Sequence, residues 1–168
     1  MPHKKRKRGR LIYLTTLCIL ASLVGFFFPF LGEAVGANEA VFFDPMALFF
    51  GGESSGFHNG YYYGFALSLN IPFLIFVMIC IVTVFASLSA RDTPRLLGAT
   101  MFLLIVLIAG LALSQPAIAA INPSISSKGL VFGYGFYISI LSMILGLCIC
   151  LLELVLCIRF RRKRDVFR

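Results

Sequence analysis

Four long apolar runs constrain this chain more than any other feature. A transmembrane helix needs about 20 consecutive apolar residues to cross the bilayer core, and each run reaches or approaches that length. The chain is 60% hydrophobic, whereas a soluble domain is nearer one-half apolar. We therefore expect an all-α transmembrane fold, an antiparallel four-helix bundle in a single membrane domain. The expected spans are 11–31, 71–90, 96–113 (with a continuation to 121 as an option) and 132–158.

Basic residues predict the orientation of this bundle. If all four runs cross, every one of the 15 Lys and Arg residues except Lys128 lies on one side. These residues fall in the tail 1–10, in the short link that holds Arg91 and Arg95, and in the tail 159–168. Because cytoplasmic segments carry the excess of Lys and Arg, we expect both termini to be cytoplasmic. The longer loop, 32–70, is then external.

A basic N-terminus followed by an apolar run is also the pattern of a secretory signal peptide. Val35-Gly36-Ala37 offers a small-residue cleavage site for it. The apolar run of about 20 residues is longer than the 7–15 of a typical signal core, so we expect the first span to be retained. Cleavage stays open as an alternative, and it would leave three spans and an external N-terminus.

The external segment 32–70 is the most informative part outside the spans. A structureless loop of that length is unusual, and the segment is too aromatic to be disordered. Asn59-Gly60 between aromatic flanks is a strong hairpin signal, because both central positions of a two-residue turn need positive φ. We expect a small external cap with a short β-hairpin, in which Gly56–His58 pairs with Tyr61–Tyr63.

Two further signals in this segment concern helix starts. Asp44-Pro45 predicts a turn and about one helical turn through Phe49. Asn70 can cap the second span, and Pro72 is tolerated in the first turn of that helix.

Proline and glycine mark the later helix boundaries. Ser114-Gln115-Pro116 predicts the end of the third span or a kink in it. Gly129, Gly133 and Gly135 are expected to open the fourth span. The spacing of Gly129 and Gly133 suits the close approach of helices in lipid.

Glu153 is the one charged residue inside a predicted span. At 100° per residue it shares a helix face with Cys150 and Cys157 but not with Cys148. Thiolates and a carboxylate can bind soft metals. A structural zinc site, however, needs four ligands, and neither histidine lies where it could complete one.

We favour a structural role for this carboxylate. Glu153 is predicted near the cytoplasmic interface, where it can reach water or form an ion pair with Arg91 or Arg95. A proton-coupled transporter is the rival interpretation, but it would place the carboxylate near the middle of the membrane.

The spans lack the groups that acid–base catalysis needs. None of them contains Asp, His, Lys or Arg. All five cysteines lie in predicted spans without a C-x-x-C motif, which argues against a redox enzyme. We therefore expect no enzymatic activity and no catalytic, metal-binding or cofactor-binding residue.

Two groups of residues outside the spans are expected to make contacts. The hairpin offers an external contact surface, with an aromatic belt at headgroup depth as the alternative; its residues are Phe57, His58, Tyr61, Tyr62 and Tyr63. The basic tails are expected to bind anionic lipid headgroups, at about 1 kcal/mol per residue near the surface, rather than nucleic acid. Those residues are Lys4, Lys5, Arg6, Lys7, Arg8, Arg161, Arg162, Lys163 and Arg164.

In outline, the order of these features resembles known membrane families. Four spans with a long first external loop of strand character and a short second one are similar to the claudin-type tetraspan arrangement. The tryptophans and cysteine pair of a claudin's first loop are missing, since the chain has no Trp, so junction function is not implied. FFFPF, ALFFGG and GLVFGYGF resemble segments of small bacterial four-span membrane proteins of unassigned function. That resemblance implies a bacterial plasma (inner) membrane.

These features together predict a non-enzymatic membrane protein that acts through protein or lipid contacts. It would be a scaffold or an accessory subunit of a membrane complex, associated with another membrane protein or with itself. The alternative is a small transporter or channel subunit, including a homo-oligomeric one. The spans offer that alternative few polar residues, most of them able to bond within their own helix: Thr15, Thr16, Ser22, Thr83, Ser87, Thr100, Ser139, Ser142 and Glu153.

Overall fold

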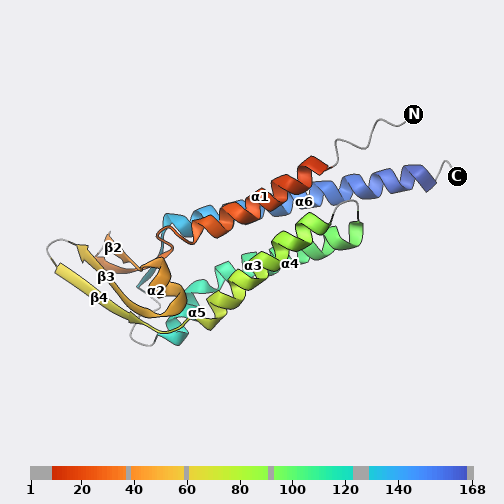
Figure 1. Ribbon diagram of the computed structural model, residues 1–168. Coiled ribbons are helices and arrows are strands. Elements are labelled where there is room, and N and C mark those ends of the chain that lie inside the picture. Colours follow the sequence, from red (N-terminus) through yellow and green to blue (C-terminus); the bar gives the residue numbers. More distant parts are fainter. Residues whose placement is uncertain (1–8, 37–38, 59–60, 91–92, 123–128, 166–168) are drawn as a thin grey trace.

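In the computed structural model, four long helices lie side by side and two small sheets stand at one end of them (Figure 1). The structure describes residues 9–36, 39–58, 61–90, 93–122 and 129–165. The helices are α1 (Gly9–Gly25), α2 (Pro45–Phe50), α3 (Ile71–Ser89), α4 (Pro94–Ala112), α5 (Ser114–Ile121) and α6 (Tyr134–Asp165). The strands are β1 (Leu31–Gly36), β2 (Glu39–Phe42), β3 (Gly52–His58), β4 (Tyr61–Leu67) and β5 (Leu130–Phe132).

The two ends of the bundle differ. The strands, α2 and α5 lie at one end, which we call the cap end (Figure 1). At the opposite end α1 begins, α3 ends, α4 begins and α6 ends, and we call it the tail end.

Within the described ranges, three helices are long and apolar enough to cross a membrane by their length and composition. They are α3, α4 and the Tyr134–Arg159 part of α6. The fourth expected span is shorter than predicted, because α1 has 17 residues and ends at Gly25 rather than near Leu31. Beyond Gly25 the backbone forms tight turns, in which the amide of Phe26 donates to the Leu23 carbonyl. Pro29, which cannot donate a backbone hydrogen bond, then leads into β1.

A three-stranded antiparallel sheet was not predicted from the sequence. Its order is β2-β1-β5, so β1 is the central strand. Leu31 lies opposite Phe132, and Gly32 lies opposite both Phe42 and Val131. The expectation that Gly129 and Gly133 lie on the opening turns of the last span is therefore wrong, because β5 occupies the residues between them.

The predicted hairpin is confirmed and is longer than expected. Gly56 lies opposite Tyr63, and His58 lies opposite Tyr61. The pairing continues to Gly52 opposite Leu67, so β3 and β4 have seven residues each. The Asn59-Gly60 turn itself lies outside the described residues.

The helix starts around this hairpin follow the predicted capping chemistry. The side chain of Asp44 accepts a 2.7 Å hydrogen bond from the amide of Met46 at the start of α2. Asn70 accepts from the amide of Phe73 at 3.2 Å and so caps α3. The third expected span ends at Ala112, and a separate short helix, α5, follows it.

Phenylalanine side chains join the cap to the bundle. Phe26, which is 2% exposed, lies at their centre. Its ring centroid is 4.8 Å from Phe30, 5.8 Å from Phe49 and 5.4 Å from Phe76. These rings come from the segment between α1 and β1, from α2 and from α3, so one buried cluster holds all three together.

Helices α1 and α6 approach each other closely at the cap end. A Cβ added to Gly135 would lie 3.0 Å from the carbonyl oxygens of both Phe28 and Pro29. The hydroxyl of Ser139 donates a 2.8 Å hydrogen bond to the carbonyl of Ser22. Small side chains on both helices therefore allow backbone contact, as is common for helices in lipid.

Candidate functional site

Glu153 lies in the interior of the bundle near the tail end. It is 8% exposed. Cys150, one turn earlier on α6, is 1% exposed and also faces the interior, whereas Cys148 is exposed. The predicted helix face is therefore correct for these three residues. The small void beside Glu153 is lined from all four long helices by Ile12, Thr15, Ser87, Leu97, Thr100, Cys150 and Glu153.

The hydroxyl groups around Glu153 already have hydrogen-bond partners. Thr15 donates to the carbonyl of Leu11 at 3.3 Å, and Thr100 donates to that of Leu96 at 2.9 Å. Bonding within the same helix was expected for these side chains. Thr16 and Ser87 also share a 2.7 Å hydrogen bond that joins α1 to α3, and the sequence did not predict this contact.

The position of Glu153 along the bundle provides a physical reason for a buried carboxylate. Ile12 is the fourth residue of α1 and Leu97 is the fourth residue of α4. Both line the same void as Glu153, so the carboxylate lies near two helix N-termini. Each N-terminus carries about half a positive charge and stabilises a nearby anion.

The predicted ion pair between Glu153 and an arginine stays a prediction. Arg95 is exposed in the first turn of α4, and Arg91 lies outside the described residues. Among the residues that the structure describes, no group of three or more His, Cys, Asp and Glu side chains could hold a metal ion. The void beside Glu153 has no room for a water molecule. This arrangement is suited to holding four helices together.

We expect Glu153→Gln to destabilise the bundle by about 0.6–2 kcal/mol, because a neutral amide loses roughly 0.3–1 kcal/mol at each of the two helix N-termini. For a chain of this size that corresponds to a fall of a few degrees in the midpoint of thermal unfolding. The measurement is thermal unfolding in mild detergent. Glu53→Gln, at an exposed position on β3, is the control and should leave the midpoint unchanged. An unchanged midpoint for Glu153→Gln would contradict the role of the charge.

The β3–β4 register places all five residues of the predicted external contact surface on two paired strands. Phe57 and Tyr62 lie opposite each other. The other three predicted residues belong to the neighbouring pairs of the two strands: His58, Tyr61 and Tyr63. Contact through any of these five residues stays a prediction.

The two basic tails differ in what the structure describes. Lys4, Lys5, Arg6, Lys7 and Arg8 lie outside the described residues. Arg161, Arg162, Lys163 and Arg164 lie on α6, which continues as a helix to Asp165 instead of ending near Ile158. The contact of both tails with anionic lipid stays a prediction.

Sequence reasoning did not predict the amide side chains that fasten the cap to the helices. Asn122 accepts a 2.7 Å hydrogen bond from the amide of Ser68, and Gln115 donates a 2.9 Å bond to the carbonyl of Leu130. Each bond joins segments that are distant in the sequence. No local motif could have revealed them, although Asn122-Pro123 does indicate a turn.

Two comparisons with known proteins give no match. A scan against protein-family models finds no match. A search of the curated proteins also finds none.

Proposed function

We propose that the chain is a four-span integral membrane protein, with α1 as the fourth span of an antiparallel, left-handed bundle. The 17 residues of α1 match the lower end of the range of about 17–25 residues for a transmembrane helix. Two interhelical hydrogen bonds support its place in the bundle, from Ser139 to Ser22 and between Thr16 and Ser87. Retention of α1 is also favoured by β1, which follows it and forms the centre of the three-stranded sheet.

Removal of α1 as a signal peptide would disrupt that sheet. Cleavage after Ala37 would separate β1 from β2, its neighbour in both sequence and space. A mature N-terminus at Asn38, detected by mass spectrometry of the purified protein, would contradict the four-span proposal.

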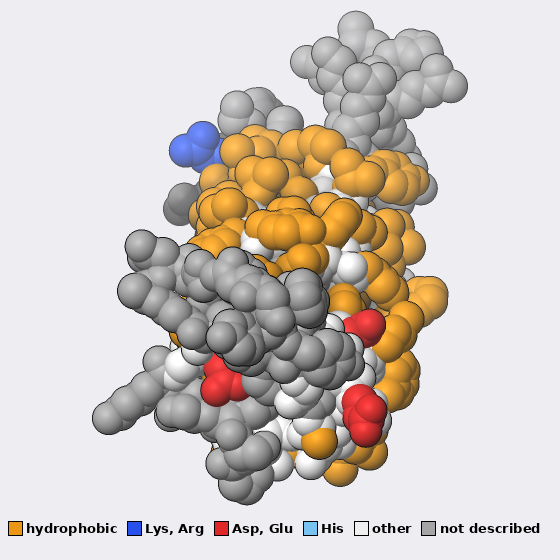
Figure 2. Space-filling model, turned by 90° about the vertical axis from the view of Figure 1, so that its left-hand side faces the viewer, with side chains coloured by type: hydrophobic (Ala, Val, Ile, Leu, Met, Phe, Trp, Pro, Cys, Tyr) orange, Lys and Arg blue, Asp and Glu red, His pale blue; other side chains and the backbone are white. Residues whose placement is uncertain are grey.

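Charge supports an orientation with the tail end in the cytoplasm. Arg95 and Arg159 lie at the tail end, whereas Asp44 and Glu53 belong to the cap end. Figure 2 looks onto the cap end and shows acidic side chains there, with hydrophobic side chains covering the helices beyond. By the positive-inside rule, both termini are cytoplasmic. We place the protein in a bacterial plasma membrane on the resemblance of its sequence segments.

The function that we propose is non-enzymatic: the protein is a scaffold or an accessory subunit that presents its cap to a membrane-protein partner. One observation carries this proposal. The buried phenylalanine cluster around Phe26 fixes the cap to the bundle. The position of β3 and β4 relative to the helices is therefore restrained. A firmly held surface loses little conformational entropy when a partner binds.

Capture of a partner tests this function. The tagged chain, extracted in a gentle detergent at its native level, should carry a second protein in stoichiometric amount. Tyr62→Ala should reduce that amount, because Tyr62 lies on β4 in the hairpin that we propose to contact the partner. Ser55→Ala, at an exposed position of β3, should not. A lone monomer in both samples, or equal capture by both variants, would contradict contact through the hairpin.

The second candidate is a transporter or channel subunit. Three buried hydroxyl side chains favour it, one on each of three helices. They are Ser22 on α1, Thr83 on α3 and Ser139 on α6. The void at Glu153 is too small for water, so a pore would have to form between copies of the chain. Homogeneous self-assembly without a partner, followed by ion or solute flux in liposomes, would favour this candidate over the accessory role.

A further inference from the structure

Helix α2 has an apolar surface on the side that the rest of the chain leaves uncovered. All six of its residues, PMALFF, are apolar. Three of them are buried: Ala47, Leu48 and Phe49. Met46 and Phe50 are four residues apart, so they share one face of the helix, and they are 56% and 63% exposed. A helix whose outer face is in water carries polar residues there, so the sequence of α2 is unsuited to water.

Backbone contacts hold α2 beside the start of α3 (Figure 1). The amide of Asn70 donates a 3.3 Å hydrogen bond to the carbonyl of Phe49, and Asn70 directly precedes Ile71, the first residue of α3. A Cβ added to Gly51, the residue after α2, would lie 2.8 Å from the amide nitrogen of Leu69. Leu69 and Ile71 are exposed as well. Exposed apolar side chains therefore lie on both sides of this contact.

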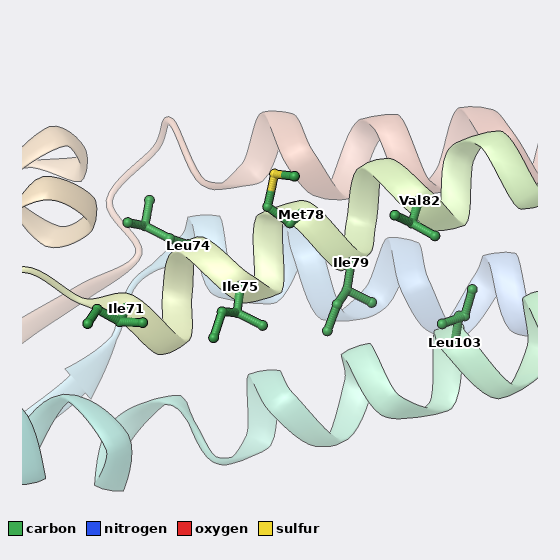
Figure 3. A pocket seen from close by; sticks show the side chains of 7 residues that line it. All are labelled: Ile71, Leu74, Ile75, Met78, Ile79, Val82 and Leu103. Atoms are coloured by element: carbon green, nitrogen blue, oxygen red, sulfur yellow. The ribbon is translucent and has the colours of Figure 1, made fainter.

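The length of α3 indicates the depth of this contact in a membrane. Its 19 residues rise by about 28 Å at 1.5 Å per residue, which matches a hydrocarbon core of about 30 Å. Ile71 is then at the edge of the core, and Met78 lies about two turns further along the helix (Figure 3). Because α2 contacts the segment just before Ile71, its exposed face lies where the acyl chains meet the headgroups.

We propose that α2 lies in the lipid interface at the cap end, with Met46 and Phe50 among the parts of the acyl chains nearest the headgroups. The inference rests on the proposal that α3 spans the membrane. Apolar side chains of interfacial helices lie about 5–10 Å into this boundary. A protein partner is disfavoured, because a protein interface carries about one hydrogen bond per 100–200 Å² and the exposed face of α2 has no polar side chain.

The absence of tryptophan from the sequence allows a test with one introduced fluorophore. Phe50→Trp is the reporter, and Met46→Trp on the same face replaces it where Phe50→Trp does not fold. Met78→Trp, at an exposed position of α3, is the control for the membrane core. Ser55→Trp is the control for water, since Ser55 shares an exposed face of β3 with Glu53. Each variant is reconstituted in phosphatidylcholine bilayers whose acyl chains carry bromine, which quenches tryptophan on contact, either near the headgroup or near the chain end.

We expect Phe50→Trp to lose most of its fluorescence with bromine near the headgroup and little with bromine near the chain end. Met78→Trp should show the opposite preference, and Ser55→Trp should be quenched by neither lipid. Stronger quenching of Phe50→Trp by bromine near the chain end would overturn the interfacial position. Equal quenching of Ser55→Trp and Phe50→Trp would also overturn it, because the lipid contact would then not be specific to α2.

The control in the membrane core separates failure of this inference from failure of the proposed span. Quenching of Met78→Trp without quenching of Phe50→Trp would overturn the inference alone. Emission from Phe50→Trp at short wavelength would then indicate a protein over α2, and emission like that of Ser55→Trp would indicate water. A Met78→Trp variant that neither lipid quenches would overturn the membrane-span proposal together with the inference.

Discussion

Gly135→Ala should destabilise the protein by about 1–3 kcal/mol, the usual cost of overpacking a close-packed interior. The added Cβ would meet the carbonyl oxygens of Phe28 and Pro29 at 3.0 Å, and the Gly25 carbonyl lies closer still. These atoms are backbone, so α1 and α6 must move apart to accommodate the methyl group. For a chain of this length, we expect the midpoint of thermal unfolding to fall by about 2–4 °C per kcal/mol. Unfolding is measured in mild detergent.

Gly98→Ala is the matched control for this change. Gly98 is also in a helix, α4, but a Cβ added there meets no atom within 4 Å. Alanine favours a helix over glycine by about 0.5–1 kcal/mol, so this variant should be unchanged or slightly more stable. Equal losses in the two variants would show that the close approach of α1 and α6 is not the cause.

Phe26→Ala should be the most destabilising single truncation at the junction of cap and bundle. Truncating a buried phenylalanine to alanine costs about 3–5 kcal/mol, and Phe26 also loses its edge-to-face contacts with Phe49, Phe73 and Phe76. Because these rings join the cap to the helices, we expect the cap to loosen before the bundle unfolds. Limited proteolysis should then cut within 31–67 faster than in the unaltered protein.

The adjacent residue provides the control for Phe26→Ala. Phe27 is 66% exposed, so Phe27→Ala removes a side chain of the same kind without opening the cluster. Its proteolysis rate and thermal midpoint should stay close to those of the unaltered protein. Equal sensitivity of the two variants would contradict the assignment of the cap's attachment to the buried ring.

Local signals predicted much of this fold. Apolar run length predicted the three membrane-length helices, and Asn59-Gly60 predicted a hairpin whose register the structure confirms. The pairing of β1 with β5 could not be predicted, because its partners are about 100 residues apart and neither strand shows a clear alternating pattern. The end of α1 was placed too late because Phe26 and Leu31 are apolar, although they belong to a turn and a strand.

The candidate site could be predicted only in part, for a similar reason. Helix geometry alone places Cys150 and Glu153 on one face of α6, and both are buried. The partners that surround Glu153 come from α1, α3 and α4. Which residues of different helices meet depends on how far each helix is shifted along its neighbour. The sequence of one helix does not contain that information.

The central place of β1 in its sheet has a consequence for biosynthesis. A ribosome completes β1 and β2 early, but β5 follows only after α3, α4 and α5. Until then one edge of β1 lacks the strand that it will pair with, and an unpaired edge is prone to join foreign strands. The three-stranded sheet is therefore completed only after α3, α4 and α5 have been synthesised. A chain interrupted before β5 would leave that edge of β1 unpaired.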